Sequence, residues 1–261
     1  MEQREGSWLP FGVGGPQGHL RLFCFPFAGG GASTFVSWRR RLPGVCVAPI
    51  QYPGRETRLE ESCRRDMAGL VGDIANELLH WLDRPYVLFG YSLGARIAFA
   101  VHHRLVQLGA PSAEKLLVAA NVAPDRRSVH PGAAWWPDER FRDHIRRYGG
   151  TPEEVFLDRE LAAMVIPVLR ADFALAEQPI VQTPVACPII AYVGDDDPVA
   201  TSAEMARWER FTRTGFHLRR FSGGHFFFRE AADFLPALAA DLTGQRISMA
   251  DGSFCPAPAC P

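Results

Sequence analysis

Three side chains of this sequence could act together in nucleophilic acyl transfer, namely Ser92, one aspartate of residues 195–197, and His225. A serine hydroxyl is a weak nucleophile at its own pKa and needs an adjacent base. Histidine titrates near neutrality, so it can take that proton and later give it to a leaving group. A buried carboxylate would hold the imidazole in one tautomer and stabilise its charged form. These residue types predict cleavage of an acyl bond through a covalent intermediate on serine.

The surroundings of Ser92 favour a nucleophilic role. Ser92 is the centre of Gly-Tyr-Ser-Leu-Gly at 90–94, which follows the apolar run 86–89 and opens a helix-like run that ends near 108. Gly-x-Ser-x-Gly between a strand and a helix is typical of a nucleophile elbow, although a chance pentapeptide in a loop is the alternative. The glycines allow strand and helix to approach closely, and the helix N-terminus offers free N–H groups. We therefore expect the hydroxyl to stand above the edge of a sheet.

The acid and the base follow two later strands. His225 comes after the last predicted strand, behind two glycines that suit a tight loop. Asp195, Asp196 and Asp197 end the strand before it, and because adjacent carboxylates repel, at least one must lie in a solvated turn. The residues alone leave the choice among the three open, and we favour Asp197. The chain order Ser, Asp, His is that of α/β-hydrolases.

A glycine-rich loop at 26–31, Pro-Phe-Ala-Gly-Gly-Gly, follows the first predicted strand. Phosphate binding is disfavoured, because neither Gly-x-Gly-x-x-Gly nor a Lys-Ser/Thr ending is present. A plain tight turn is another interpretation. With an elbow in the same chain, the loop favours half of an oxyanion hole, formed by the N–H of Leu93 and an N–H of Phe27 or Ala28.

Other charged residues have simpler interpretations. Arg55 and Glu56 are expected to form a surface ion pair of little energetic value, with a place at the rim of the site as the alternative. His102 and His103 lie too far along the elbow helix to serve Ser92, so we interpret them as ordinary helix residues. The arginine clusters, such as 39–41, read as solvated surface, with a docking patch for an acidic partner as the alternative.

The elements that must position these residues alternate between strands and helices, which predicts a mostly parallel sheet covered on both faces. Between about 123 and 183 no strand-like run occurs, and short helices there predict a lid over the carboxyl edge of the sheet, or else a crossover made of several helices. The predicted strands are 20–25, 45–50, 86–89, 115–121, 188–193 and 216–221, and the predicted helices 33–42, 64–82, 95–108, 138–147, 152–157, 159–176, 202–211 and 229–242.

The domain organisation that we expect has three parts. Residues 1–18 form a flexible N-terminal segment, 19–243 one domain with the lid insertion at 123–183, and 244–261 a disordered Pro-rich tail. A chain of 261 residues is long enough for such a core.

Composition excludes several classes of function. A net charge of -1 gives no electrostatic case for binding nucleic acid or an anionic membrane. No signal peptide and no apolar stretch of membrane-spanning length is present, so we expect a cytoplasmic protein without a membrane partner. Cys24, Cys46 and Cys187 read as buried apolar residues, and no Cys/His spacing suggests a metal site. We expect neither a metal nor another cofactor.

Five motifs in order resemble the type II thioesterases, stand-alone α/β-hydrolases that accompany polyketide synthases and nonribosomal peptide synthetases. The resemblance covers about residues 20–242. The motifs are Phe-Pro-Phe-Ala-Gly-Gly at 25–30, Tyr-Pro-Gly-Arg-Glu at 52–56, Phe-Gly-Tyr-Ser-Leu-Gly-Ala at 89–95, Gly-Asp-Asp-Asp at 194–197 and Gly-Gly-His-Phe-Phe at 223–227.

The resemblance implies a fold, a reaction and a partner. It implies an α/β-hydrolase fold whose substrate is an acyl or aminoacyl thioester on the phosphopantetheine arm of an acyl or peptidyl carrier protein. Hydrolysis would free carriers blocked by wrong or decarboxylated units. In the family pattern the acid maps to Asp197 and the first oxyanion donor to Ala28. A monomer without a cofactor of its own is expected.

Three alternatives remain open at this point. One is an esterase or lipase-like hydrolase of free small esters, although the loop at 25–30 is not the His-Gly-Gly-Gly type of many esterases. Another is a module that docks on carrier proteins with little catalysis, which the presence of Ser92, Asp197 and His225 disfavours. The last is acyl transfer to a nucleophile other than water.

Overall fold

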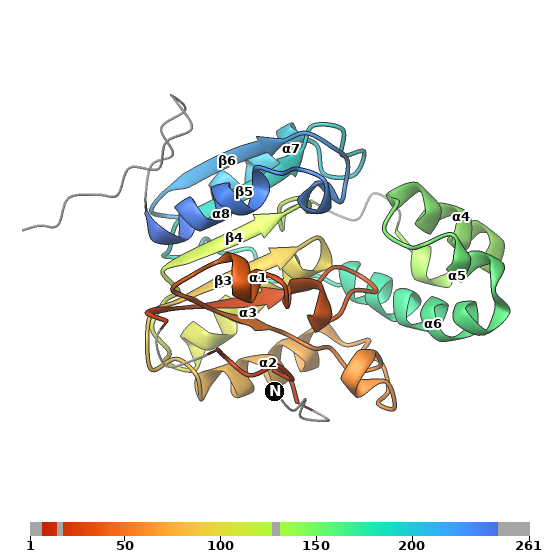
Figure 1. Cartoon of the computed structure of the whole chain (residues 1–261), viewed down its shortest axis with the longest axis horizontal. Helices are drawn as coiled ribbons and strands as arrows, with labels where there is room; N and C mark the ends of the chain where they lie inside the picture. The colour runs from red at the N-terminus through yellow and green to blue at the C-terminus, as the bar shows by residue number, and fades with distance from the viewer. Residues whose placement is uncertain (1–6, 15–17, 127–130, 245–261) are drawn as a thin grey trace, which may run out of the picture.

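Six parallel strands form the centre of the molecule (Figure 1). The structure, a computed structural model, describes residues 7–14, 18–126 and 131–244. The sheet order β2-β1-β3-β4-β5-β6 confirms the predicted α/β class, and each strand lies within two residues of its predicted ends. The strands are β1 Leu20–Phe25, β2 Val45–Pro49, β3 Tyr86–Tyr91, β4 Lys115–Ala119, β5 Ile189–Gly194 and β6 Phe216–Phe221.

The burial of the central strands explains why their sequences are unbroken apolar runs. Every residue of β3 and β5 is buried, as expected for central parallel strands covered on both faces. The edge strand β6 instead contains partly buried and exposed residues and only its last residue, Phe221, is buried. The sequence pattern thus distinguishes the buried strands β3 and β5, which Ser92 and Asp197 follow, from the edge strand β6, which His225 follows.

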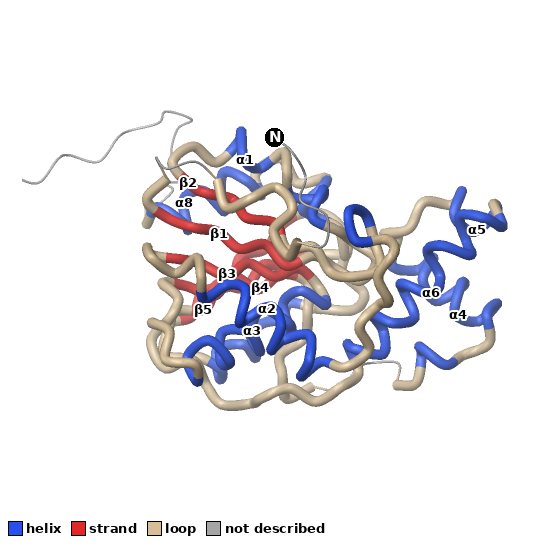
Figure 2. Tube along the Cα trace, turned by 90° about the horizontal axis from the view of Figure 1, so that it is seen from below, coloured by secondary structure: helices blue, strands red, loops and turns tan. Residues whose placement is uncertain are grey.

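Helices cover both faces of the sheet (Figure 2). The helices α2, Met67–Leu79, and α3, Leu93–Gln107, pack on one face, while the short α1, Trp38–Arg41, and α8, Phe234–Thr243, pack on the other. The Asp66 carboxylate accepts hydrogen bonds from the N–H groups at 68 and 69, which explains why α2 begins there.

Three predicted helices are divided or begin late, and the helix predicted at 64–82 spans only Met67–Leu79. The helix predicted at 33–42 is a 3₁₀ turn, Ala32–Phe35, followed by α1. Phe35 at the end of this turn and Trp38 at the start of α1 are both buried, with ring centroids 4.8 Å apart, so the chain bends here to pack both rings into the core.

The other two differences are of the same kind. The helix predicted at 202–211 divides into α7, Ser202–Ala206, and a 3₁₀ segment, Arg207–Phe211. The helix predicted from residue 229 begins at Phe234, after a 3₁₀ turn, Phe227–Arg229, that buries Phe227. In each case a buried aromatic residue in a short 3₁₀ segment interrupts the helix.

The described part of the N-terminal segment packs onto the domain. Leu9 and Val13 are buried, and the N–H of Gln51 donates to the carbonyl of Trp8 at 2.9 Å. The expectation of a flexible segment is therefore wrong for residues 7–14. The predicted tail lies outside the described residues except for Gly244, and the domain boundaries stay a prediction.

A helical insertion separates β4 from β5 and stands beside one end of the sheet (Figure 1). It contains α4, Asp138–Tyr148, α5, Glu154–Leu157, and α6, Arg159–Ala176, close to the three predicted helices. The insertion has a small apolar core of its own, formed by Phe141, Ile145, Phe156, Ala162, Ile166 and Leu169. We refer to α4–α6 as the helical insertion.

His102 gives the fold a predicted acid sensitivity. Its side chain is 2% exposed, with Nε2 3.1 Å from the Ser112 hydroxyl. Burial, aided by the charge of His103, lowers the pKa of His102 to about 4. In the unfolded chain His102 binds a proton as the pH falls through about 6.5, whereas in the native state it stays neutral until about pH 4. The contribution of His102 to the free energy of unfolding is therefore fully present above pH 6.5 and is lost as the pH falls toward 4.

We expect the free energy of unfolding to fall by about 2 kcal/mol between pH 7 and pH 5 through this one group. In urea unfolding at pH 7 and pH 5, His102→Gln should show little of this change in the free energy of unfolding, whatever its stability at pH 7. The exposed His80 provides the control, and His80→Gln should keep the wild-type difference. An unchanged pH difference in His102→Gln would contradict the assignment.

Candidate active site

Ser92 occupies a strained turn between β3 and α3. Its backbone has φ 52° and ψ -119°, and it directly precedes the helix. A Cβ on Gly90 would lie 2.3 Å from the Gly94 carbonyl oxygen, and one on Gly94 would lie 2.0 Å from the Phe25 carbonyl oxygen. Both glycines are therefore required for this approach of strand and helix. The turn has the geometry that was predicted for a nucleophile elbow.

The structure brings Ser92, Asp197 and His225 together. Nε2 of His225 lies 3.1 Å from the Ser92 hydroxyl, and Nδ1 lies 2.9 Å from Oδ2 of Asp197. The acid and the base are each 4% exposed. The other carboxylate oxygen of Asp197 accepts hydrogen bonds from the N–H groups of Val199 and Ala200, at 2.8 and 3.0 Å. Hydrogen bonds thus fix both the carboxylate and the imidazole, as a base for a serine nucleophile requires.

Of the three adjacent aspartates, only Asp197 faces the histidine. Asp195 and Asp196 are exposed, and Asp195 forms a surface ion pair with Arg220 at 2.7 Å. The division follows from the turn after β5, which sends one carboxylate inward and leaves the others in solvent. The geometry matches the choice made from the sequence, while the catalytic roles themselves stay predictions.

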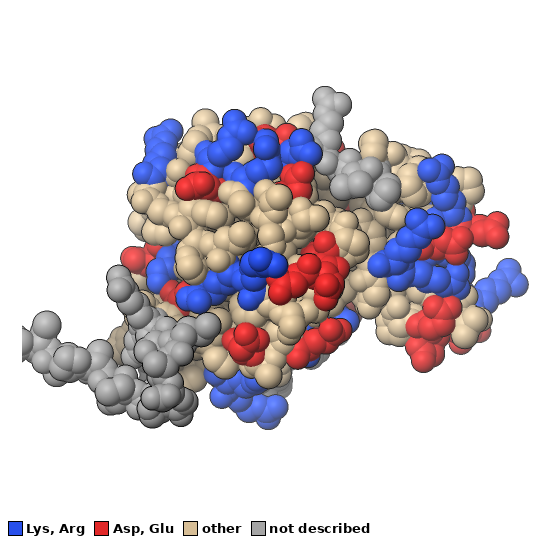
Figure 3. All heavy atoms as spheres, turned by 90° about the horizontal axis from the view of Figure 1, so that it is seen from above, with Lys and Arg blue, Asp and Glu red and all other residues tan. Residues whose placement is uncertain are grey.

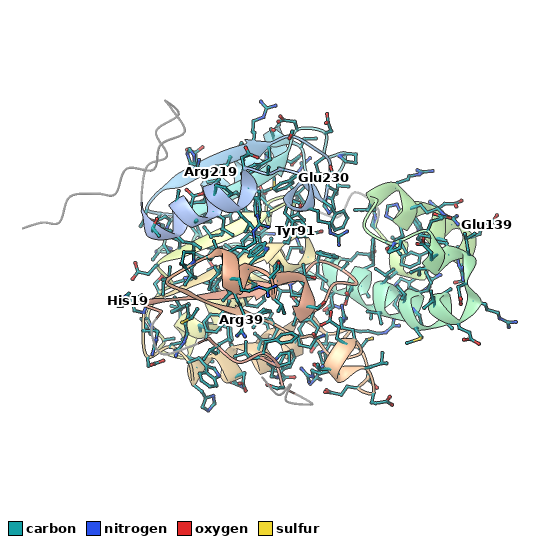
Figure 4. The ribbon with its side chains drawn as sticks, viewed as in Figure 1. His19, Arg39, Tyr91, Glu139, Arg219 and Glu230 are labelled. Atoms are coloured by element: carbon teal, nitrogen blue, oxygen red, sulfur yellow. The ribbon has the colours of Figure 1, made fainter. Side chains whose placement is uncertain are left out.

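Tyr91 positions the histidine and was missed in the sequence. Its hydroxyl donates a hydrogen bond to the main-chain carbonyl of His225 at 2.6 Å, from the centre of the molecule (Figure 4). Burial, with the nearby charge of Asp197, raises the pKa of Tyr91, so the phenol keeps the proton that it donates. The residue before Ser92 thus holds the loop that carries the base.

The predicted oxyanion loop lies beside the elbow. Phe27, Ala28 and Leu93 all line the cavity that contains Ser92. Leu93 is the first residue of α3, so its N–H has no acceptor within the helix. A hydrogen bond of 2.9 Å from the N–H of Gly30 to the carbonyl of Phe27 closes the loop into a turn. The loop thus borders the same cavity as Ser92, and its role as an oxyanion hole stays a prediction.

Arg55 is buried, which corrects its interpretation as half of a surface ion pair with Glu56. Its guanidinium forms a bidentate pair with the fully buried Asp172 of α6, with Nη2 and Oδ1 2.8 Å apart. Burial is the largest single effect and lowers the pKa of Arg55, but the charge and the hydrogen bonds of Asp172, with smaller contributions from Cys63 and Tyr52, together outweigh burial and raise the pKa. Glu56 instead accepts hydrogen bonds from the main chain and the hydroxyl of Ser33.

Asp172 also reaches the oxyanion loop. Its Oδ2 accepts a hydrogen bond of 2.7 Å from the N–H of Gly29, the residue after Ala28. One carboxylate therefore connects the helical insertion, the loop after β1 and the loop after β2. The signal available in the sequence was an acid in the otherwise apolar stretch 171–176, where a buried carboxylate needs a partner.

A cavity of about 110 Å³ opens over Ser92. Since a water molecule needs only about 10–15 Å³ by this measure, the cavity has room for a small acyl group. The helical insertion forms its roof, so the predicted cover over the serine is present. Its lining from the insertion includes Ile145, Tyr148, Leu169 and Phe173, and its floor includes Ser92, Leu93, Arg96, Asn121 and His225.

Arg39 of the cluster 39–41 is half-buried and donates to two main-chain carbonyls, so the expectation of a solvated surface is wrong for this residue. Cys24, Cys46 and Cys187 are buried, as predicted, and no cluster of His, Cys, Asp or Glu in the described ranges could hold a metal ion. Within those ranges no helix has the length and apolar character to cross a bilayer. Basic and acidic side chains lie next to each other on the face seen in Figure 3, including the part over the insertion.

Comparisons with known proteins identify relatives over most of the chain. The thioesterase domain family matches residues 20–245. The thioesterase PikA5 of Streptomyces venezuelae is 37% identical over 233 residues, which cover 86% of this chain and 81% of PikA5.

Two solved structures are similar in fold and sequence. The RedJ thioesterase from the prodiginine pathway of Streptomyces coelicolor has a TM-score of 0.80 and 33% identity, covering 92% of this chain and 100% of RedJ. The type II thioesterase BorB from the borrelidin biosynthetic cluster has a TM-score of 0.79 and 34% identity, and the match covers 89% of this chain and 96% of BorB.

Proposed function

Because the chain belongs to the thioesterase domain family, we propose that it edits a polyketide or nonribosomal peptide synthase by hydrolysing aberrant acyl thioesters. The substrate is an acyl group on the phosphopantetheine arm of an acyl or peptidyl carrier domain. Support comes from the relatives, which are named for thioesterases of such pathways, and from the five sequence motifs. The products are a free acid and a carrier thiol that can be loaded again.

The proposed mechanism rests on one observation, the hydrogen-bonded series Ser92, His225 and Asp197 at the floor of the cavity. His225 takes the proton of Ser92 as the hydroxyl oxygen attacks the thioester carbonyl, and Asp197 stabilises the imidazolium. The negative oxygen accepts hydrogen bonds from the N–H groups of Leu93 and Ala28.

The second half of the cycle reverses these roles. His225 gives its proton to the departing thiolate and leaves an acyl-enzyme on Ser92. Water then enters, and His225 removes its proton as the water oxygen attacks the acyl carbon. The bond from that carbon to the Ser92 oxygen breaks, His225 returns the proton to this oxygen, and the free acid departs. The cavity roof limits the access of bulk water to this intermediate.

The deciding measurement compares an acyl-loaded carrier protein with the matched free oxoester of the same acyl group. We expect kcat/KM for the carrier substrate to be higher by about tenfold or more, because docking of the carrier adds at least about 1.4 kcal/mol of binding energy. Equal or faster hydrolysis of the free ester would make the protein an esterase instead. Tight binding of the carrier without turnover would make it a docking module, and an acyl product other than the free acid would make it a transferase.

A further inference from the structure

Tyr148 lies beside the predicted base in the cavity that contains the nucleophile. It is the last residue of α4, and its ring centroid is 5.4 Å from that of His225, with the two ring planes at 82°. The residue lines the cavity together with Ser92. The helical insertion therefore supplies a phenol to the wall of the cavity next to the imidazole.

Packing on several sides fixes the position of this ring. The rings of His144 and Phe173 contact it edge-on, with centroids 5.1 and 5.9 Å away. Two residues after Tyr148, a Cβ on Gly150 would lie 2.2 Å from Cζ of Phe226, so the chain there rests directly on the residue that follows His225. These contacts hold the phenol ring against the imidazole.

The hydroxyl of Tyr148 differs from those of the other tyrosines. The chain has five tyrosines, and all of them lie in the described residues. Four hydroxyls donate to a main-chain carbonyl or a carboxylate, namely those of Tyr52, Tyr86, Tyr91 and Tyr192. The hydroxyl of Tyr148 has no hydrogen-bond partner among the described residues. Of the five it is also the one that lines the cavity, so the protein leaves a donor free where a substrate can reach it.

This hydroxyl keeps its proton at neutral pH. Burial, with the nearby charge of Asp197, raises the pKa of Tyr148 to about 12. A neutral phenol can donate one hydrogen bond, and a polar group withdrawn from bulk water is stabilised by an acceptor. The cavity thus presents an O–H donor close to the triad that the protein itself does not use.

The proposed mechanism determines which part of the substrate lies here. His225 gives its proton to the departing sulfur, so the sulfur must lie beside Nε2 of His225. In phosphopantetheine two methylene groups join this sulfur to an amide, so the amide nitrogen is about 4 Å from the sulfur by ordinary bond lengths. The arm of the carrier, rather than the acyl group, therefore passes the wall that Tyr148 forms next to His225.

We propose that the hydroxyl of Tyr148 binds the carbonyl oxygen of this first amide of the phosphopantetheine arm and so orients the thioester at Ser92. The inference deepens the proposed function and rests on it. An amide carbonyl is a strong acceptor, and the phenol donates to it while His225 serves the sulfur two methylene groups away. Simple esters lack an amide at this position, so the contact favours thioesters of the carrier arm.

A purely structural role for Tyr148 is the competing explanation. Its ring covers the imidazole and packs against Phe173, and a phenylalanine could do both. This explanation gives the hydroxyl no task, so it predicts that Tyr148→Phe changes the hydrolysis of every thioester equally or not at all. The proposal predicts a loss only for thiols that carry an acceptor where the arm has its amide carbonyl.

The test uses propanoyl thioesters of three thiols. N-acetylcysteamine reproduces the end of the arm, 5-sulfanylpentan-2-one keeps the carbonyl without the amide N–H, and 4-methylpentane-1-thiol has a methyl group in place of the carbonyl oxygen. We expect Tyr148→Phe to lower kcat/KM for the first two by about fivefold or more, which is the loss expected for one hydrogen bond, and to leave the third unchanged. Comparing the variant with the wild type on each substrate cancels differences among the thiols as leaving groups.

Tyr86→Phe is the matched control, because it removes the hydroxyl of a tyrosine outside the cavity lining, and it should keep the wild-type ratios among the three thioesters. If Tyr148→Phe slows all three equally, or none, the contact with the arm is overturned and thioester hydrolysis stands. A loss confined to the N-acetylcysteamine thioester would assign the hydroxyl to the amide N–H and would also overturn it. If the wild type hydrolyses none of the three and no propanoyl carrier, the proposed function itself is overturned.

Discussion

Replacing Ser92 by alanine should reduce hydrolysis of an acyl carrier by about 10⁴-fold or more. The hydroxyl is the atom that His225 Nε2 approaches at 3.1 Å, and without it no acyl-enzyme can form. The oxyanion donors remain and would account for a small residual rate. The free energy of unfolding should change little, because alanine keeps the size and the backbone of the elbow.

Two measurements check this expectation. The rate of thiol release gives the loss of activity, and the mass of protein quenched during turnover should show an acyl adduct on the wild type and none on Ser92→Ala. Ser62→Ala serves as the control, because Ser62 is exposed and remote from the cavity lining. If Ser92→Ala hydrolysed the acyl carrier at a rate within tenfold of the wild type, the proposed mechanism would be contradicted.

The parts of the site that the sequence predicted are those fixed by local pattern. The Gly-x-Ser-x-Gly turn demands its glycines because Cβ atoms there would overlap main-chain oxygens. The strand ends place Asp197 and His225 at one edge of the sheet, because the carboxyl ends of parallel strands meet there. The order along the chain was therefore enough to bring His225 and one of three aspartates to Ser92, and the resemblance indicated Asp197.

The parts that were missed depend on contacts between distant segments. Arg55 and Asp172 are 117 positions apart, and neither has a local pattern that indicates the other. Tyr91 and His225 are 134 positions apart, and the elbow motif does not show that the Tyr91 hydroxyl reaches the main-chain carbonyl of His225.

Asp172 is the residue outside the predicted site whose loss should have the largest effect. Asp172→Ala leaves the buried Arg55 without a counter-charge, and breaking a buried pair in this way costs about 3–5 kcal/mol. It also frees the N–H of Gly29 beside the predicted oxyanion donor Ala28. We expect a loss of stability in urea unfolding and a fall in kcat of about tenfold to a hundredfold, with little change in KM.

The double variant Arg55→Met/Asp172→Leu separates the two effects. Removing both charges in favour of apolar side chains should restore most of the stability, because the cost of the unpaired cation disappears. It cannot restore the hydrogen bond to Gly29, so kcat should stay low. Asp172→Asn keeps an amide oxygen that can accept from the N–H of Gly29, but it leaves the charge on Arg55 unbalanced. It should therefore be less stable than the double variant and have a higher kcat. If kcat instead follows stability across these variants, Asp172 is a structural residue and does not position the loop. If kcat follows the acceptor for Gly29, the carboxylate sets the geometry in which the thioester oxygen is bound.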